Sequence, residues 1–96
     1  MIIHFHPDAE REFADAFGWY EHQRKGLGAD FLLCVDESME RIRSNPHMYP
    51  IVHDNVRRII VRRFPFAIFY EEIKSEIRIL GVFHERRTPE QWMSRK

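Results

Sequence analysis

Residues 56–83 read VRRIIVRRFPFAIFYEEIKSEIRILGVF, a stretch in which strand-forming side chains dominate. Residues 56–62, 66–71 and 77–83 are rich in isoleucine, valine and phenylalanine, which favour β-strands. The second and third segments are nearly continuous apolar runs, as expected of strands covered on much of both faces. Phe64-Pro65 and Lys74-Ser75 mark two short reversals between them. The stretch therefore predicts three strands joined as an antiparallel meander.

Two amphipathic helices are predicted before the strands. The first has an apolar stripe at helical spacing, formed by Ala9, Phe13, Ala16, Phe17 and Tyr20. It should begin with Asp8 as N-cap and run to about Arg24. The second should start at about Ala29 and end before Pro46, and its stripe consists of Phe31, Leu32, Val35, Met39 and Ile42. Gly26-Leu27-Gly28 favours a tight reversal between the two, so we expect an antiparallel helical hairpin.

Shorter elements flank this core. Residues 2–5 form a β-like opening, whereas residues 46–55 read as an irregular connection. Thr88 as N-cap and Pro89 at the first helical position predict a short terminal helix, from which Trp92 packs back on the sheet. The expected order is β-α-α-β-β-β-α, an α+β fold with the helical hairpin on a twisted antiparallel sheet. The opening strand should lie beside the second or the last strand, and the pattern does not choose between them.

The length and composition of the chain restrict its class. Its 96 residues fit one domain, residues 1–96, and 13 aromatic side chains can fill a core without metal or disulfide. One cysteine, Cys34, cannot form an internal disulfide, which fits a reducing compartment. No apolar run approaches the roughly 18–20 residues that a bilayer needs, and the N-terminus lacks an export pattern. We expect a cytoplasmic protein that has no cofactor and does not contact a membrane.

The charge is balanced overall but divided along the chain. The 15 basic and 15 acidic side chains cancel, which argues against general adhesion to nucleic acid. Residues 1–50 nevertheless carry a net charge of −4 and residues 51–96 a net charge of +4. A localised basic face on the predicted sheet and C-terminal segment therefore remains available for an acidic partner.

Segments spread over the whole chain carry a family resemblance. They are the opening strand, Trp19-Tyr20, Gly26-Leu27-Gly28, Asn45-Pro46 with Tyr49-Pro50, Val56-Arg57-Arg58, residues 63–70 and residues 82–92. In this order they look like the RelE/ParE superfamily of toxins from type II toxin–antitoxin modules. The most specific pair is Phe64-Pro65-Phe66 followed by the ending His84-x-x-Arg87-x-Pro89. The resemblance implies a small bacterial toxin, of the kind also described as plasmid stabilisation proteins, that a cognate antitoxin holds silent.

Two branches of the superfamily imply different functions. Members similar to RelE are ribosome-dependent mRNA endonucleases that use basic residues on the sheet, including a strand arginine where this chain has Ala67. This chain also has only three lysines with which to grip ribosomal RNA: Lys25, Lys74 and Lys96. Members similar to ParE bind DNA gyrase and trap its cleaved complex, which needs no catalytic residue. We favour the ParE branch; an mRNA endonuclease and a non-toxic degenerate member are the alternatives.

The arginines of the basic half are the candidate binding residues. Arg57, Arg58, Arg62 and Arg63 flank an apolar strand core, and alternation should send Arg57 and Arg63 to one face and Arg58 and Arg62 to the other. They could be solvated strand ends paired with acidic helices, or they could dock an acidic segment of the antitoxin. The resemblance adds further candidate contacts for the antitoxin or the target, which are Arg86, Arg87 and Trp92.

The histidines are only weak candidates for catalytic residues or metal ligands. His84, Arg86 and Arg87 could act as general acid–base and phosphate-binding groups, although a satisfied histidine at a strand end fits the pattern better. His4 and His6 have the spacing of two metal ligands on a strand, but no further ligand cluster accompanies them, so no metal site is predicted.

The aromatic side chains of the first helix have a structural interpretation. Phe17, Trp19 and Tyr20 should contact the core or the sheet, because acidic rather than basic residues surround them. Met39 and Ile42 could meet an antitoxin helix, but burial against the sheet is the simpler expectation.

Overall fold

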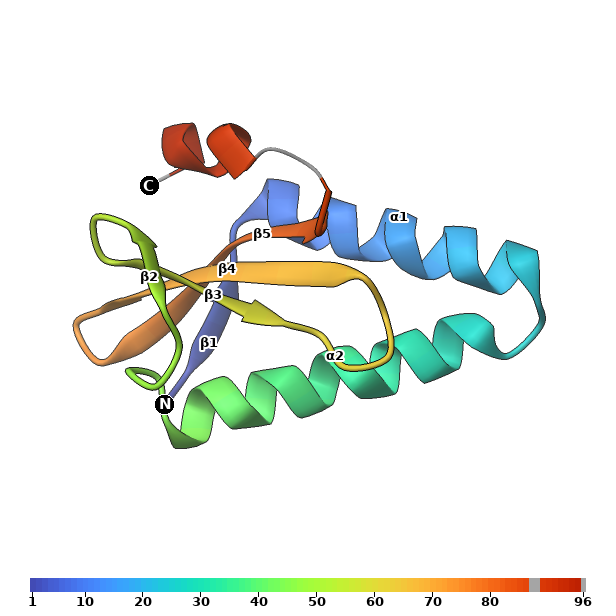
Figure 1. The fold of residues 1–96 in the computed structure, drawn as a ribbon, viewed down its shortest axis with the longest axis horizontal. Coiled ribbons are helices and arrows are strands. Elements are labelled where there is room, and N and C mark those ends of the chain that lie inside the picture. Colours follow the sequence, from blue (N-terminus) through green and yellow to red (C-terminus); the bar gives the residue numbers. More distant parts are fainter. Residues whose placement is uncertain (87–88, 96) are drawn as a thin grey trace.

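The computed structural model describes residues 1–86 and 89–95, and Figure 1 shows a helical hairpin beside a twisted sheet. In chain order the elements are β1 (Ile3–Phe5), α1 (Pro7–Gln23), α2 (Leu27–Ser44), β2 (Ile51–His53), β3 (Val56–Ile60), β4 (Phe66–Ile73), β5 (Glu76–His84) and a 3₁₀ helix (Pro89–Arg95). The predicted α+β fold is confirmed, with β2 as an added strand. The predicted N-cap at Thr88 lies outside the described residues.

The sheet is mixed rather than purely antiparallel. Its strand order is β1-β5-β4-β3-β2, and β3, β4 and β5 form the predicted antiparallel meander. β1 runs parallel to β5, with Ile3 opposite Ile77, so the opening strand pairs with the last strand. Main-chain bonds from Ile77 N to Ile2 O and from His6 N to Ile79 O, each 2.9 Å, hold it there.

The prediction of an irregular connection over residues 46–55 is wrong in part. Ile51–His53 forms an edge strand antiparallel to β3, with a register shift between Ile51 and His53. All three of its side chains are exposed, so the strand lacks the alternation that marks a half-buried strand in sequence. Backbone pairing with β3, and not side-chain burial, places it in the sheet.

Both helices begin differently from the prediction. α1 is capped by His6, whose Nδ1 accepts the Asp8 N–H at 3.0 Å, because Pro7 occupies the first helical position and Asp8 lies inside the helix. α2 begins at Leu27, just after Gly26 with its left-handed φ of 91°. The Glu21 carboxylate accepts hydrogen bonds from the N–H groups of Gly26 and Gly28 at 3.0 Å, and so satisfies main-chain donors at the N-terminal end of α2. Within the described part of the chain, no helix is long and apolar enough to cross a membrane.

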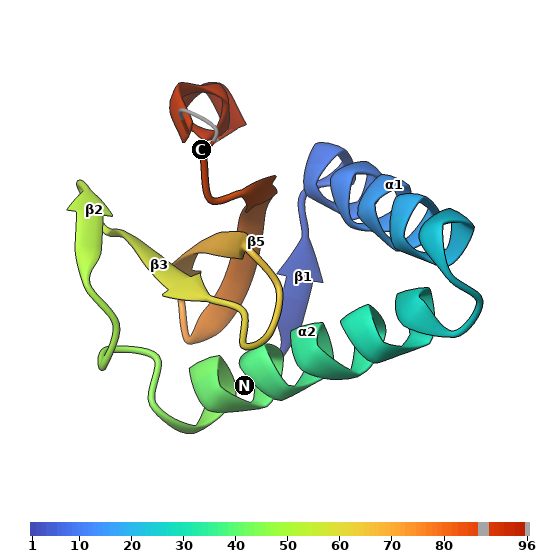
Figure 2. The ribbon, with the colours of Figure 1, turned by 45° about the vertical axis from the view of Figure 1, so that its right-hand side comes forward.

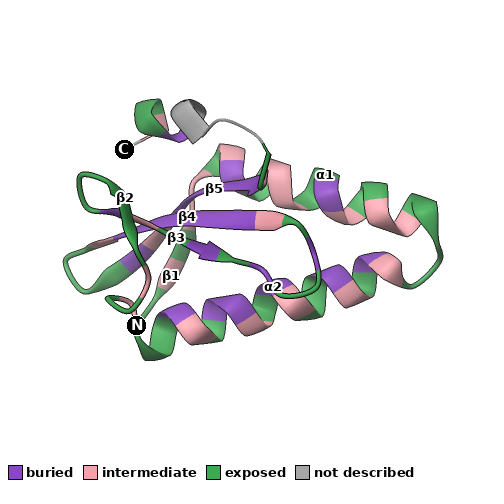
Figure 3. Ribbon diagram, in the orientation of Figure 1, coloured by how far each residue is buried: buried purple, intermediate pink, exposed green. Residues whose placement is uncertain are grey.

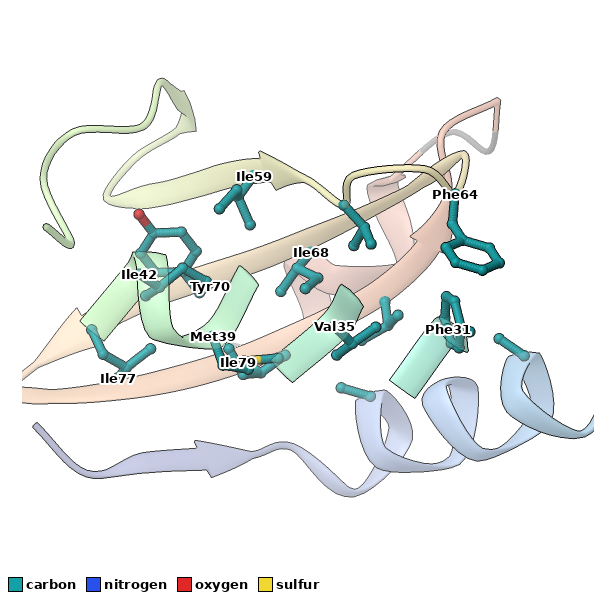
Figure 4. Packing of buried hydrophobic residues seen from close by; sticks show 14 residues of the cluster. Phe31, Val35, Met39, Ile42, Ile59, Phe64, Ile68, Tyr70, Ile77 and Ile79 are labelled. Atoms are coloured by element: carbon teal, nitrogen blue, oxygen red, sulfur yellow. The ribbon is translucent and has the colours of Figure 1, made fainter. Parts of the chain in front are cut away.

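The core has two layers, one on each face of the sheet. Figures 2 and 4 show the hairpin covering one face, where Phe31 and Val35 of α2 pack with Ile68 and Ile79. On the far face lies a smaller cluster of buried residues, which are Val56, Ala67, Phe69, Leu80, Phe83 and Trp92. An extra residue in β5 between Ile79 and Gly81 shifts its register against β4. Buried residues therefore line both faces of β4 and β5, as their continuous apolar runs predict (Figure 3).

Tyr70 ties the loop after α2 to the sheet and gives a pH-dependent stability. Its hydroxyl donates to the Pro46 carbonyl at 2.7 Å, and burial raises the pKa of Tyr70 from 10.0 to about 12. The contribution of this phenol to stability should be complete below pH 10 and should be lost as the pH rises through about 12. In Tyr70→Phe we expect the free energy of unfolding to fall less at alkaline pH than in the wild-type protein. At neutral pH the variant should be less stable by about 1 kcal/mol, because the hydrogen bond is missing. Urea unfolding measured from pH 8 to 12 checks this, and identical profiles for both proteins would contradict it.

Candidate protein-binding surface

Arg57 is engaged inside the molecule and anchors a loop. It lies on β3 opposite Tyr70, on the face that the helices cover. Its Nη1 donates to the carbonyl oxygens of His47 at 3.0 Å and Tyr49 at 2.7 Å. These bonds satisfy two carbonyl groups of the loop between α2 and β2. Arg57 therefore offers less to a partner than the sequence indicates.

The prediction that Arg58 and Arg62 share one face of a strand, and Arg57 and Arg63 the other, is wrong. β3 ends at Ile60, so strand alternation does not extend to Arg62 or Arg63. Arg62 Nη1 instead lies 3.0 Å from Glu37 Oε2 of α2. Arg58 is exposed opposite Phe69, on the far face of the sheet, and its side chain has no ion-pair partner within the described residues. Arg63 is exposed in the β3–β4 turn with a left-handed φ of 70°.

His84 and Arg86 lie at the end of β5, close to the β3–β4 turn. The Glu85 N–H donates to Pro65 O at 2.8 Å, which brings this segment beside the turn that carries Arg63. His84 Nδ1 accepts the Arg86 N–H at 3.2 Å, and its ring meets Phe66 edge-on at 5.6 Å. This is the satisfied strand-end histidine that the sequence favours. Arg86 is exposed, and Arg87 lies outside the described residues.

Trp92 is part of the far-face core and not a free contact surface. Only 1% of it is exposed, and its ring stacks on Phe69 with the centroids 5.7 Å apart. It also contacts His53 of β2, at a centroid distance of 5.7 Å. Trp92 thus packs on the sheet as predicted. Because it is buried, it is not one of the exposed binding residues, among which the family resemblance places it.

Arg95 and Glu12 form a clamp that the sequence does not predict. Arg95 Nη2 lies 2.7 Å from Glu12 Oε2, its Nη1 lies 2.9 Å from Glu12 Oε1, and Nη1 also donates to Leu80 O at 2.9 Å. Glu12 Oε1 accepts the Val82 N–H at 3.1 Å as well. The hydrogen bond to Glu12 raises the pKa of Arg95 above its usual value. The C-terminal 3₁₀ helix is thereby fixed to both α1 and β5.

Trp19 departs from the prediction that Phe17, Trp19 and Tyr20 contact the core or the sheet. It is 59% exposed and meets Tyr20 edge-on at 5.1 Å, whereas Phe17 and Tyr20 pack against the core. Trp19 lies outside the apolar stripe of α1, which is the sequence signal that could have placed it correctly. It borders a groove of about 260 Å³ between α1 and the end of the sheet, lined by Glu12, Asp15, Ala16, Trp19, Phe66, Val82 and His84.

The histidines near the N-terminus have structural partners. His4 Nε2 lies 3.3 Å from Glu76 Oε2, and His6 caps α1. No group of three or more potential ligands, counting histidine, cysteine, aspartate and glutamate, comes together within residues 1–86 and 89–95. The exposed cations Arg58, Arg63 and Arg86 carry no side-chain ion pair among the described residues. Arg63 and Arg86 belong to adjoining segments, whereas Arg58 lies on β3.

Comparison with known proteins identifies the family. The family model described as the ParE toxin of the type II toxin–antitoxin system parDE matches residues 3–89. A solved structure described as the chromosomal ParDE TA system from P. aeruginosa contains a chain of similar fold, with a TM-score of 0.76 and 16% sequence identity. The similarity covers 88% of this chain and 95% of that chain. No curated protein sequence matches. The resemblance to the ParE branch is thus confirmed, and the chain belongs to the ParE toxin family of type II toxin–antitoxin systems.

Proposed function

We propose that this ParE family member inhibits DNA gyrase by binding it, and that a cognate antitoxin neutralises it. The observation that carries the proposal is the dispersal of the arginines of the sheet. Arg57 holds a loop, Arg62 pairs with α2, and Arg58 lies on the far face of the sheet. Cleavage of RNA without a metal needs several cations around one phosphate. Dispersed cations instead suit contacts spread over a protein interface.

Ala67 supports the same proposal. This position aligns with the strand arginine that the resemblance to RelE would require, and an alanine cannot stabilise a phosphate. Ala67 is 2% exposed within the far-face cluster. A side chain longer than that of alanine would therefore not fit there without repacking. The Nδ1 of His84 is also occupied by a main-chain hydrogen bond.

The partners follow from the charge pattern. The exposed arginines of the sheet and its ends can donate hydrogen bonds to the carboxylates of an acidic antitoxin segment, since guanidinium groups bind carboxylates in a bidentate manner. With gyrase as the target, the toxin works in the bacterial cytoplasm. A toxin and antitoxin encoded together would also stabilise a plasmid that carries them.

The test compares two activities of one preparation. Purified protein should inhibit supercoiling by DNA gyrase and should leave translated mRNA intact. Addition of the protein encoded in the adjacent reading frame should restore supercoiling. Codon-positioned cuts in the ribosomal A site, together with unaffected gyrase, would overturn the proposal in favour of an mRNA endonuclease.

Charge reversal at Arg58 should weaken the complex with the antitoxin. Arg58→Glu is expected to lower the affinity by at least about tenfold, which corresponds to about 1.4 kcal/mol, because an exposed cation becomes a repelling anion. Isothermal titration with the purified antitoxin measures this. Lys25→Glu in the hairpin loop is the matched control, since it changes the net charge equally at a position remote from the sheet.

Arg62 needs a separate control in the same experiment. Arg62→Glu should weaken the complex too, but it also places a second carboxylate against Glu37, from which Arg62 Nη1 is 3.0 Å away. Its unfolding must therefore be measured alongside the affinity. Unchanged affinity in both Arg58→Glu and Arg62→Glu would remove the sheet arginines from the antitoxin interface.

A further inference from the structure

One acidic stripe of α1 extends beyond the C-terminal clamp into the open groove. Asp8, Glu12, Asp15 and Trp19 follow one another at intervals of four, three and four residues, which places them along one side of the helix. Arg95 occupies the part of the stripe formed by Asp8 and Glu12, with its Nε 3.7 Å from Asp8 Oδ2. The part formed by Asp15 and Trp19 borders the groove of about 260 Å³.

Arg95 shows which side chain the occupied part of the stripe accommodates. Its guanidinium makes a bidentate pair with Glu12, at 2.7 and 2.9 Å, and its side chain is 10% exposed. Its guanidinium carbon lies 5.3 Å from the centroid of the Phe83 ring. A carboxylate in the plane and an aromatic ring on the face are the two contacts that a guanidinium makes best.

The open part of the stripe offers the same two components. Asp15 is an exposed carboxylate that has no hydrogen bond or ion pair within the described part of the chain. Trp19 supplies an indole ring, the best of the aromatic faces for a cation, and 59% of it is exposed. Ala16 and Val82 also line the groove and can cover the methylene groups of a long side chain.

No lysine or arginine of the described residues lines the groove. Arg86 is exposed two residues beyond His84, and no bond joins its guanidinium to a groove residue among those described. Glu12 also lines the groove, although its charge is already paired with Arg95. The unpaired charge of the groove is therefore that of Asp15, which is negative.

We propose that this groove receives an arginine side chain from the protein target of the toxin. Asp15 accepts the N–H groups of the incoming guanidinium, and Trp19 stacks on its plane, beside the intramolecular Arg95 clamp. That this arginine belongs to the target protein rests on the proposed function. The chemistry of the groove, which is selection of a planar cation by a carboxylate and an indole, does not.

A short peptide tests the chemistry directly. The probe is Ac-Gly-Arg-Gly-NH₂, with Ac-Gly-Lys-Gly-NH₂ for comparison, titrated while the two indole N–H signals are followed by NMR. Trp19→Phe assigns the signals. The arginine peptide should shift the Trp19 signal, leave that of buried Trp92 in place, and bind several-fold more tightly than the lysine peptide. No shift at Trp19, or equal responses to both peptides, would overturn the proposal.

A pair of charge-removing variants tests the role of Asp15. Asp15→Asn should weaken both the peptide response and inhibition of gyrase by about tenfold. Glu10→Gln, which removes an exposed carboxylate from the same helix, should change neither. If wild-type protein inhibits gyrase and Asp15→Asn inhibits it equally, the groove does not bind the target. If wild-type protein leaves gyrase unaffected, the proposed function fails, and the peptide titration alone decides the chemistry of the groove.

Discussion

Replacing Phe31 with alanine should lower the free energy of unfolding by about 3–5 kcal/mol, the largest effect that we expect of any single side chain. Phe31 is fully buried on α2, where it faces the sheet. Its ring lies 5.8 Å from that of Phe13, 5.1 Å from Tyr20, and 5.2 Å from both Phe64 and Phe66, measured between centroids. The substitution would leave a cavity at the point where both helices meet the β3–β4 turn.

Chemical denaturation of the variant measures this effect, and a neighbouring leucine supplies the control. Leu33 lies on the same helix but is 67% exposed, so Leu33→Ala should change the free energy of unfolding by no more than about 0.5 kcal/mol. Similar losses in Phe31→Ala and Leu33→Ala would mean that α2 does not bury Phe31 against the sheet.

Removal of the Glu12 carboxylate should cost roughly 2–3 kcal/mol, which is the second largest effect. Glu12→Ala deprives Arg95 of its bidentate partner and leaves the Val82 N–H without its acceptor. Since the side chain of Arg95 is only 10% exposed, its charge would then be largely buried without a carboxylate partner other than the more distant Asp8. The C-terminal 3₁₀ helix should consequently be released from α1 more readily.

A double-mutant cycle separates this clamp from general effects of the substitution. Glu12→Ala, Arg95→Ala and the double variant should show a coupling of more than about 1 kcal/mol, because the two side chains share one set of hydrogen bonds. Glu10→Ala, on the exposed side of the same helix, is the control. Additive losses within about 0.5 kcal/mol would contradict a direct clamp.

The central part of the fold could be predicted from sequence because its signals are local and repeated. The helical stripes of α1 and α2, the break at Gly26, and the apolar runs of β4 and β5 each specify their elements without reference to the rest of the chain. The two-sided burial of the sheet followed from the same runs. β1 could not be paired from sequence, because a three-residue strand carries no register information and both candidate neighbours are apolar.

The candidate surface was less predictable because it depends on where strands end and on contacts between distant residues. Arg58 and Arg62 would share a face if β3 continued, but the strand ends at Ile60 and Arg62 turns to Glu37. The Glu12–Arg95 pair joins residues 83 positions apart, and neither residue belongs to a recognisable motif. Such contacts are set by the packing of the C-terminal segment on the sheet, which no local pattern encodes.

Accumulation of cleaved DNA on gyrase is the most direct test of the proposed mode of action. Purified protein is incubated with DNA gyrase, supercoiled plasmid and ATP, and double-strand-cleaved plasmid is quantified by electrophoresis. We predict that cleaved plasmid increases with the concentration of this protein and returns to the background level when the cognate antitoxin is in excess. No increase at any concentration of folded protein would contradict an inhibitor that traps the cleaved gyrase complex.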